Sequence, residues 1–171
     1  KHQIEMPKIQ GPEKLKSDLE LRKDLKSKIP KDYLPMWLRE REIETRQVEP
    51  VDLLKAEKLP PYRSTWMKPT GKLPSDERIH QALLLYVSDM GLLGAAVNPH
   101  EVNFMSKKFQ SASLDHVMWF HGKVNFNNWV LHHMHSPISQ NARGFSRGSI
   151  YTKAGKLIAS TAQEGLMRIW D

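Results

Sequence analysis

The order of the predicted elements limits the fold of this chain more than any other feature: one long apolar helix is followed by strands, with no helix between them. From Ala82 to Leu93 apolar residues occupy nearly every face of the helix, which is typical of a helix surrounded by protein. Ser75 is a plausible N-cap, so the helix is expected to begin near residue 76. Because the apolar stretch 81–97 is shorter than the roughly 20 residues that cross a bilayer, we interpret it as a buried core helix and expect no membrane span.

The strands are predicted from short strand-like runs that are bounded by turn residues. Two runs precede the helix and four follow it, at 43–48, 62–67, 116–121, 129–135, 142–152 and 157–170. Residues 125–128, Pro137 and the turn 153–156 separate the later runs. Strands that follow one another through short turns pair antiparallel, so the chain is expected to form an α+β domain in which a curved antiparallel sheet wraps a long central helix.

The composition suits one folded domain with a basic surface. Hydrophobic residues make up 39% of the 171 residues and charged residues 26%, a balance that favours a buried core over a disordered chain. The formal charge of +7 favours an anionic partner, such as a nucleic acid, a membrane surface or a phosphate-bearing small molecule. No nucleic-acid-binding motif accompanies this charge, so we expect no nucleic-acid partner. The absence of cysteine excludes disulfides and thiolate nucleophiles.

Residues 1–40 are predicted to be a linker that carries an amphipathic helix, and residues 41–171 to be the folded domain. The apolar residues that fall roughly on one helical stripe after Pro12 are Leu15, Leu19, Leu25 and Ile29. Acidic residues are interspersed with basic ones in this segment. We therefore expect a solvated helix packed on its neighbour rather than a helix lying on a membrane.

Four motifs give the chain a family resemblance. They are 86–89 (YVSD), 113–121 (SLDHVMWFH), 142–145 (ARGF) and 159–165 (ASTAQEG). Together they resemble the second hotdog repeat of acyl-CoA thioesterases of the TesB (thioesterase II) type, a family that includes peroxisomal enzymes of eukaryotes. The resemblance covers about residues 40–170 and implies the hotdog fold. Members of this family carry two hotdog repeats, and only the second is evident here.

The resemblance also implies a catalytic set. The family uses an Asp, a Thr or Ser, and a Gln to orient a hydrolytic water, and the matching positions here are Asp89, Ser113 and Gln163. Bacterial members usually carry Thr where this chain has Ser113, and the hydroxyl is kept. The implied reaction is hydrolysis of a fatty acyl-CoA to free acid and coenzyme A, with no cofactor and no covalent acyl-enzyme.

Independently of the family, only Asp89 stands out. A carboxylate in an apolar helix is costly to bury unless it is hydrogen-bonded or protonated. The residues alone leave two interpretations open: a catalytic acid, or a buried polar residue that positions a loop. Burial would raise the pKa of Asp89 and hydrogen bonds from Ser113 and Gln163 would lower it, so the direction of its pKa shift is not fixed by the sequence.

Coenzyme A carries a pyrophosphate and a ribose phosphate, so basic residues near the site entrance are expected to bind it. Arg143, Arg147 and Lys123 are the candidates, with Lys156 beside them. The competing interpretation is an exposed, charged strand face that binds nothing.

Three histidines raise the question of a metal. His133 and His135 would share one face of a strand while His132 points to the opposite face. A zinc site also needs a third or fourth protein ligand, and no cysteine or nearby acid offers one. We therefore expect no metal, and interpret these histidines as surface or interface residues.

Two serine-based arrangements compete with the water mechanism. Residues 144–148 match the G-x-S-x-G pattern around Ser146, but that pattern requires a sharp turn into a helix, and here a strand and a hairpin turn follow. Ser113 and His116 lie close in sequence, yet on a strand His116 would point away from Ser113, so a local triad is not expected.

The alternative function is a non-catalytic half that binds acyl-CoA or serves assembly, and that needs the missing N-terminal repeat for activity. Hotdog domains pair side by side, so a homodimer, or pairing with the missing repeat, is expected. The expected compartment is peroxisomal, with cytoplasmic as the alternative. Residues 168–171 are not a Ser-Lys-Leu-type address, so no targeting signal is visible in this segment.

Overall fold

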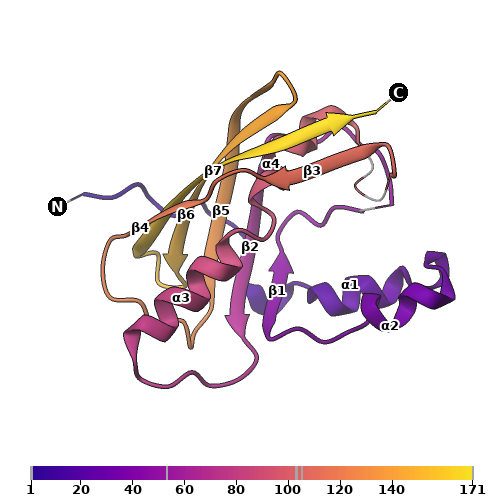
Figure 1. The fold of residues 1–171 in the computed structure, drawn as a ribbon. Helices are drawn as coiled ribbons and strands as arrows, with labels where there is room; N and C mark the ends of the chain where they lie inside the picture. The colour runs from indigo at the N-terminus through magenta and orange to yellow at the C-terminus, as the bar shows by residue number, and fades with distance from the viewer. Residues whose placement is uncertain (1, 53, 103, 105, 171) are drawn as a thin grey trace.

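Among the described residues, seven strands form one antiparallel sheet, and α3 (Glu77–Ser88) lies across one face of it, while α1 and α2 lie beside β1 (Figure 1). The computed structural model describes residues 2–52, 54–102, 104 and 106–170. The helices are α1 (Asp18–Asp24), α2 (Leu34–Trp37), α3 (Glu77–Ser88) and α4 (Leu92–Val97), with 3-10 turns η1 (Pro12–Lys14), η2 (Lys26–Lys28), η3 (Lys31–Tyr33) and η4 (Asn98–His100). The strands are β1 (Ile43–Gln47), β2 (Tyr62–Pro69), β3 (Phe109–Ser113), β4 (Val117–Phe120), β5 (Val130–Gln140), β6 (Arg143–Thr152) and β7 (Leu157–Ile169).

The strand order is β1-β2-β5-β6-β7-β3, and β4 also pairs with β7, so β3 and β4 share one edge of the sheet. The α+β prediction is confirmed, and the six expected strands form close to their predicted positions. β3 was not predicted. Pro137 does not end β5, because a register shift between His135 and Ile138 lets the strand continue past a residue that has no N–H to donate.

The predicted single helix is wrong in length. It divides into α3 and α4, because Asp89 caps the C-terminus of α3 and Gly91 adopts a left-handed φ of 89°. Such a φ is accessible to glycine without strain, so the chain can turn there and start a second helix. The N-cap is Asp76 rather than Ser75, since the Asp76 side chain accepts a hydrogen bond from the backbone N–H of Arg78.

The prediction that α3 is surrounded by protein is also wrong. Leu84 and Val87 are fully buried, but Leu85, Tyr86 and Met90 are 41%, 62% and 41% exposed. Within the described part of the chain, the helical stretch 77–100 is apolar and long enough by composition to cross a membrane. Half of the most apolar 18 residues in this stretch are buried against the rest of the molecule, as in the core helix of a folded domain.

The core lies between α3 and the sheet. α4 lies closer to the sheet than α3 does. Leu84 and Val87 pack in one cluster with Val130, Ile150 and Ile158 of the strands. α4 packs on β5, β6 and β7. This close approach depends on glycine: a Cβ added at Gly144 would lie 2.5 Å from the Cβ of Ala96, and one added at Gly165 would lie 2.5 Å from Leu93 Cδ1.

The N-terminal segment covers the opposite face of the sheet. Trp66, Leu131 and Tyr151 point away from α3, and Met6, Ile9 and Leu15 pack against them. The indole N–H of Trp66 donates to the backbone oxygen of Gln10 at 2.9 Å. Residues 6–15 are thus packed onto the domain. The division into segments 1–40 and 41–171 stays a prediction, and its end residues 1 and 171 lie outside the described residues.

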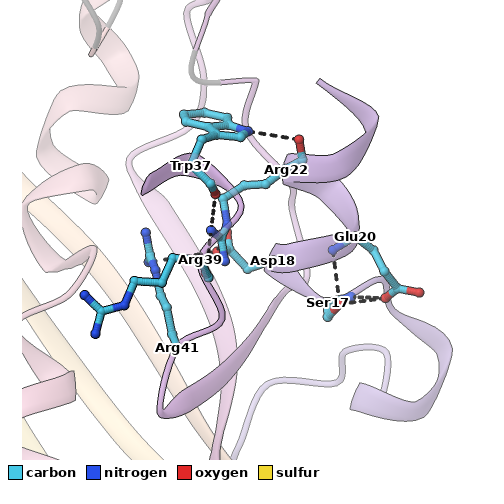
Figure 2. Close-up of polar contacts among 7 residues, drawn as sticks. All are labelled: Ser17, Asp18, Glu20, Arg22, Trp37, Arg39 and Arg41. Atoms are coloured by element: carbon cyan, nitrogen blue, oxygen red, sulfur yellow. Dashed lines mark hydrogen bonds and ion pairs between the residues drawn. The ribbon is translucent and has the colours of Figure 1, made fainter. Parts of the chain in front are cut away.

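The predicted amphipathic helix is shorter than its apolar stripe, because only seven residues form α1. Hydrogen bonds of Arg22 also tie α1 to the end of α2 and to the residues that follow it (Figure 2). The buried Arg22 guanidinium donates to Asp18 at 2.9 Å and to the backbone oxygens of Trp37 and Arg39, and the Trp37 indole donates back to the Arg22 backbone oxygen at 2.9 Å. Ser17 and Glu20 close the start of the helix as a capping box.

We predict that Gly144→Ala destabilises the fold by about 1–3 kcal/mol, because the added Cβ meets Ala96 and α4 must move away from the sheet. The measurement is the free energy of unfolding in denaturant. Gly71→Ala is the matched control, since nothing lies within 4 Å of a Cβ added there. Equal stability of the two variants would contradict the close-packing argument.

Candidate active site

The end of α3, the end of β3 and the middle of β7 meet at Asp89. The Ser113 hydroxyl donates to Asp89 Oδ1 at 2.9 Å, and the amide nitrogen of Gln163 donates to the same oxygen. These three residues are the set that the sequence predicted, and the fold brings them together across 74 residues of chain. Their catalytic roles stay predictions.

The turn between β3 and β4 sets this geometry. Ser113 pairs with Gly165 and Val117 pairs with Ala162, so residues 114–116 face only residues 163–164 of β7. One extra residue on the edge makes it bulge, and a bulge redirects the side chains that follow. The bulge is held by the backbone N–H of Glu164, which donates to the Asp115 carboxylate at 2.8 Å.

Solvent exposure differs sharply within the site. Gln163 is 1% exposed, whereas the Asp89 side chain is 47% exposed and Ser113 is also exposed. The argument that Asp89 is an acid buried in a helix is therefore wrong: it lies past the last turn of α3, at the surface. Both hydrogen bonds end on Oδ1, and Oδ2 accepts none from the described residues. A carboxylate held in this way keeps one oxygen free to take a proton.

His116 is the site residue that the sequence argument missed. Its Nδ1 lies 3.3 Å from the Gln163 amide nitrogen and 3.9 Å from Asp89 Oδ1, and its Nε2 lies 2.8 Å from the Ser88 hydroxyl. Strand alternation predicted that His116 would point away from Ser113, but the bulge breaks that alternation. Burial lowers the pKa of His116 and outweighs the opposite effect of the Asp89 and Asp115 carboxylates, which favours the neutral ring.

His132 lies behind the site, inside the core. It has no exposed surface, and its Nε2 lies 3.1 Å from the Thr161 hydroxyl. The expectation of a surface or interface residue is wrong for His132. Burial, reinforced by the nearby His116 and His133, lowers its pKa to about 3, so the ring is neutral at physiological pH.

Ser146 lacks the geometry of a nucleophile elbow. It sits on β6 directly opposite Gln163 and is fully buried, and β6 runs through a turn into β7 rather than into a helix. Its hydroxyl has no hydrogen-bond partner among the described residues. A buried hydroxyl in mid-strand is not accessible to a substrate carbonyl.

The three basic candidates do not join the Asp89 cluster. Arg143 pairs with Glu164 at 3.4 Å, and the Arg147 guanidinium lies over the Phe145 ring. Both arginines alternate with the inward-facing Ser146 and so lie on the other face of the sheet. Lys123 is exposed on the loop before β5. In the described parts of the chain, no three His, Asp or Glu side chains lie close enough to hold a metal ion.

The comparisons with known proteins point to one family. A family model described as acyl-CoA thioesterase matches residues 37–166. Acyl-CoA thioesterase 2 of Haemophilus influenzae is 34% identical over 167 residues, which cover 98% of this chain and 58% of that protein. The human acyl-coenzyme A thioesterase 8 is 31% identical, over 98% of this chain and 54% of its own length. The chain thus spans a little over half the length of these relatives.

A yeast relative and two solved structures extend this finding. The peroxisomal acyl-coenzyme A thioester hydrolase 1 of Saccharomyces cerevisiae is 32% identical over 92 residues, 53% of this chain and 26% of that protein. The acyl-CoA thioesterase II structure from Mycobacterium marinum superimposes with a TM-score of 0.69 at 28% identity, over 99% of this chain and 57% of that one. A hot dog fold protein from Alicyclobacillus acidocaldarius, 15% identical, has a TM-score of 0.66 over 98% of this chain and 56% of its own. The predicted hotdog fold is confirmed.

We predict that His132 makes the fold acid-sensitive. The unfolded chain binds a proton at His132 below its ordinary pKa of 6.5, and the folded chain does not do so until about 3. Stability is therefore lost as the pH falls from 6.5 towards 3, by about 1.4 kcal/mol per pH unit from this group.

The measurement is the free energy of unfolding at pH 7 and at pH 5. His132→Gln should lose about 2 kcal/mol less than wild type between these two values. His135→Gln, at an exposed histidine on the same strand, is the control. A wild-type loss no greater than that of His132→Gln would contradict the prediction.

Proposed function

The chain belongs to the acyl-CoA thioesterase family, and on that premise we propose that it hydrolyses fatty acyl-CoA thioesters to free fatty acid and coenzyme A. The observation that carries the proposal is the state of the Asp89 carboxylate. One of its oxygens is fixed by donors from two strands, and the other is free on a side chain that is 47% exposed. A water bound to the free oxygen is held and deprotonated by the same group.

In the proposed reaction, Asp89 Oδ2 accepts a proton from the water as the water oxygen attacks the thioester carbonyl carbon. The resulting tetrahedral intermediate breaks its carbon–sulfur bond, and the sulfur leaves as the thiolate of coenzyme A. The proton on Asp89 then passes to the thiolate, which restores the carboxylate. The reaction consumes one water and uses no cofactor.

Ser113 and Gln163 orient the base. The hydroxyl and the amide each place a hydrogen on Oδ1, so the carboxylate plane cannot rotate freely. The amide oxygen of Gln163 is enclosed and has no partner among the described residues, which supports a role as donor to Asp89 rather than as acceptor from the water. The family resemblance implied that Gln163 helps to orient the water. We propose that it does so indirectly, by fixing the Asp89 carboxylate.

The substrate side of the proposal rests on the family and on charge. The net charge of +7 suits the phosphates of coenzyme A, and Lys123, Arg143 and Arg147 remain the proposed phosphate-binding residues. Arg143 and Arg147 lie on the face of the sheet opposite to Gln163. They could therefore contact coenzyme A only where it extends past the edge of the sheet to that face. A peroxisomal location is proposed from the name of the yeast relative, with the cytoplasm as the alternative.

The exposed apolar side chains around the site support pairing with a second hotdog repeat. Those that gather on the exposed side of α3 and along the β3–β4 edge are Leu85, Tyr86, Met90, Leu114, Val117, Trp119 and Phe120. Tyr86 and Met90 flank Asp89 in the sequence, and Leu114 follows Ser113. A partner that covers this apolar surface would therefore also close the site.

The relatives are long enough to supply such a partner, because this chain spans only 54–58% of the two that it matches along most of its length. We propose that the partner is a second hotdog repeat, and that a second copy of this chain replaces it when the chain is alone. The other candidate function is a half that binds acyl-CoA but is inactive until the second repeat is present. The exposure of Asp89 in the single chain favours this alternative, because no partner covers the site.

We predict that Asp89→Asn lowers turnover by roughly 100- to 10,000-fold, because an amide cannot take the proton from water. The measurement is release of free thiol from a long-chain acyl-CoA, made on this chain and on a two-repeat chain. Asp32→Asn is the matched control, because Asp32 is an exposed acid distant from Asp89 in the sequence. Undiminished turnover of Asp89→Asn in both chains would refute the mechanism, and turnover only in the two-repeat chain would favour the inactive-half alternative.

We predict that the isolated chain is a dimer, with a mass near twice 19.8 kDa in sedimentation equilibrium. Trp119→Glu places a charge in the apolar surface and should shift the equilibrium to monomer, because an unpaired charge is costly at an apolar interface. Ile4→Glu is the control, since Ile4 is 73% exposed on the N-terminal segment. A monomeric wild-type chain would count against the pairing.

A further inference from the structure

The hydrogen bonds around His116 fix which of its ring nitrogens carries the proton. The Ser88 hydroxyl donates its single hydrogen to the backbone oxygen of Leu85 at 2.8 Å, so towards His116 Nε2 it can only accept. The Gln163 amide nitrogen, 3.3 Å from His116 Nδ1, can only donate. Both hydrogen bonds of the His116 ring require the same tautomer: a neutral ring with the proton on Nε2 and a lone pair on Nδ1.

This tautomer accounts for both hydrogens of the Gln163 amide nitrogen. One is donated to Asp89 Oδ1 and the other to His116 Nδ1. A carboxylate and an imidazole lone pair are both acceptors, so turning the amide over would place its oxygen against two acceptors. The amide is therefore held with its nitrogen towards the carboxylate. The 3.9 Å separation between His116 Nδ1 and Asp89 is not an ion pair in this state, because the ring is neutral.

We propose that His116 is a positioning residue for the thioesterase reaction, which keeps the Gln163 amide nitrogen directed at Asp89, while Ser88 keeps the His116 lone pair directed at Gln163. The proposal rests on the proposed function. His116 touches neither the water nor the thioester, and it acts only through Gln163. Its side chain is 14% exposed, so it is sheltered between α3 and β7 rather than open to substrate.

Acid pH should undo this arrangement. Protonation at Nδ1 replaces the lone pair with an N–H, which would then oppose the N–H of Gln163. The ionisable groups that act on His116 are the Asp89 and Asp115 carboxylates, which favour the charged ring, and the buried His132 ring behind it. Burial outweighs the carboxylates and keeps the pKa of His116 below its ordinary value of 6.5. The arrangement is therefore complete at neutral pH and is lost only on acidification.

The test compares His116→Ala, His116→Asn and His116→Gln in whichever form of the chain turns over, alone or with a second repeat. Asparagine can place an acceptor where Nδ1 lies, whereas glutamine reaches the position of Nε2. His116→Ala should lower kcat roughly 10- to 100-fold with KM nearly unchanged, since a misdirected base costs rate rather than binding.

His116→Asn should recover most of that loss and should hold its kcat to lower pH than wild type, and His116→Gln should not recover. Ser88→Ala should fall between wild type and His116→Ala. His121→Ala is the control, because His121 contacts Ser160 and not this cluster. Unchanged kcat in His116→Ala, or equal loss in the Asn and Gln variants, would overturn the proposal.

A second measurement needs no turnover. Long-range proton–nitrogen NMR of this chain at pH 7 should report His116 protonated at Nε2, and Ser88→Ala should weaken that preference. A proton on Nδ1 would overturn the proposal whatever the kinetics. If the tautomer is as expected but Asp89→Asn retains full turnover, the proposed function fails while the hydrogen-bond arrangement stands.

Discussion

The hydrogen bonds that end on Asp89 Oδ1 are the interaction on which the site depends. They join the end of α3 to β3 and β7, which are separated by long stretches of sequence. A carboxylate at the end of a helix would otherwise rotate freely in water. Two donors fixed on strands remove that freedom on one oxygen and leave the other open, and the proposed role of Asp89 as a general base rests on this geometry.

Behind that carboxylate the polar groups continue into the protein. Gln163 connects the exposed Asp89 to His116, and His116 connects to Ser88 on α3. His132 lies further inside, neutral and paired with Thr161. These hydrogen bonds link α3, the β3–β4 turn, β5 and β7, so they help to hold those elements in one relative position.

The fold allows this arrangement through local exceptions to regular structure. Gly91 ends one helix and starts another, which places Asp89 at a helix end instead of in a buried turn. The extra residue between β3 and β4 turns His116 towards Gln163. Gly144 lets α4 lie directly on the sheet. Each exception is a backbone feature, and each positions a side chain of the candidate site or the helix that packs on the sheet.

The sequence by itself determined the α+β class, six of the strands, and, through its motifs, the family and the three residues at Asp89. It did so because apolar periodicity, turn residues and motifs are each patterns of residues that lie close together along the chain. It did not predict the helix break, β3, the exposure of Asp89 or the position of His116 beside Gln163. Those depend on which residues of β7 face the β3–β4 turn and on how closely α4 meets the sheet, and such pairings between distant segments are decided only when the chain packs.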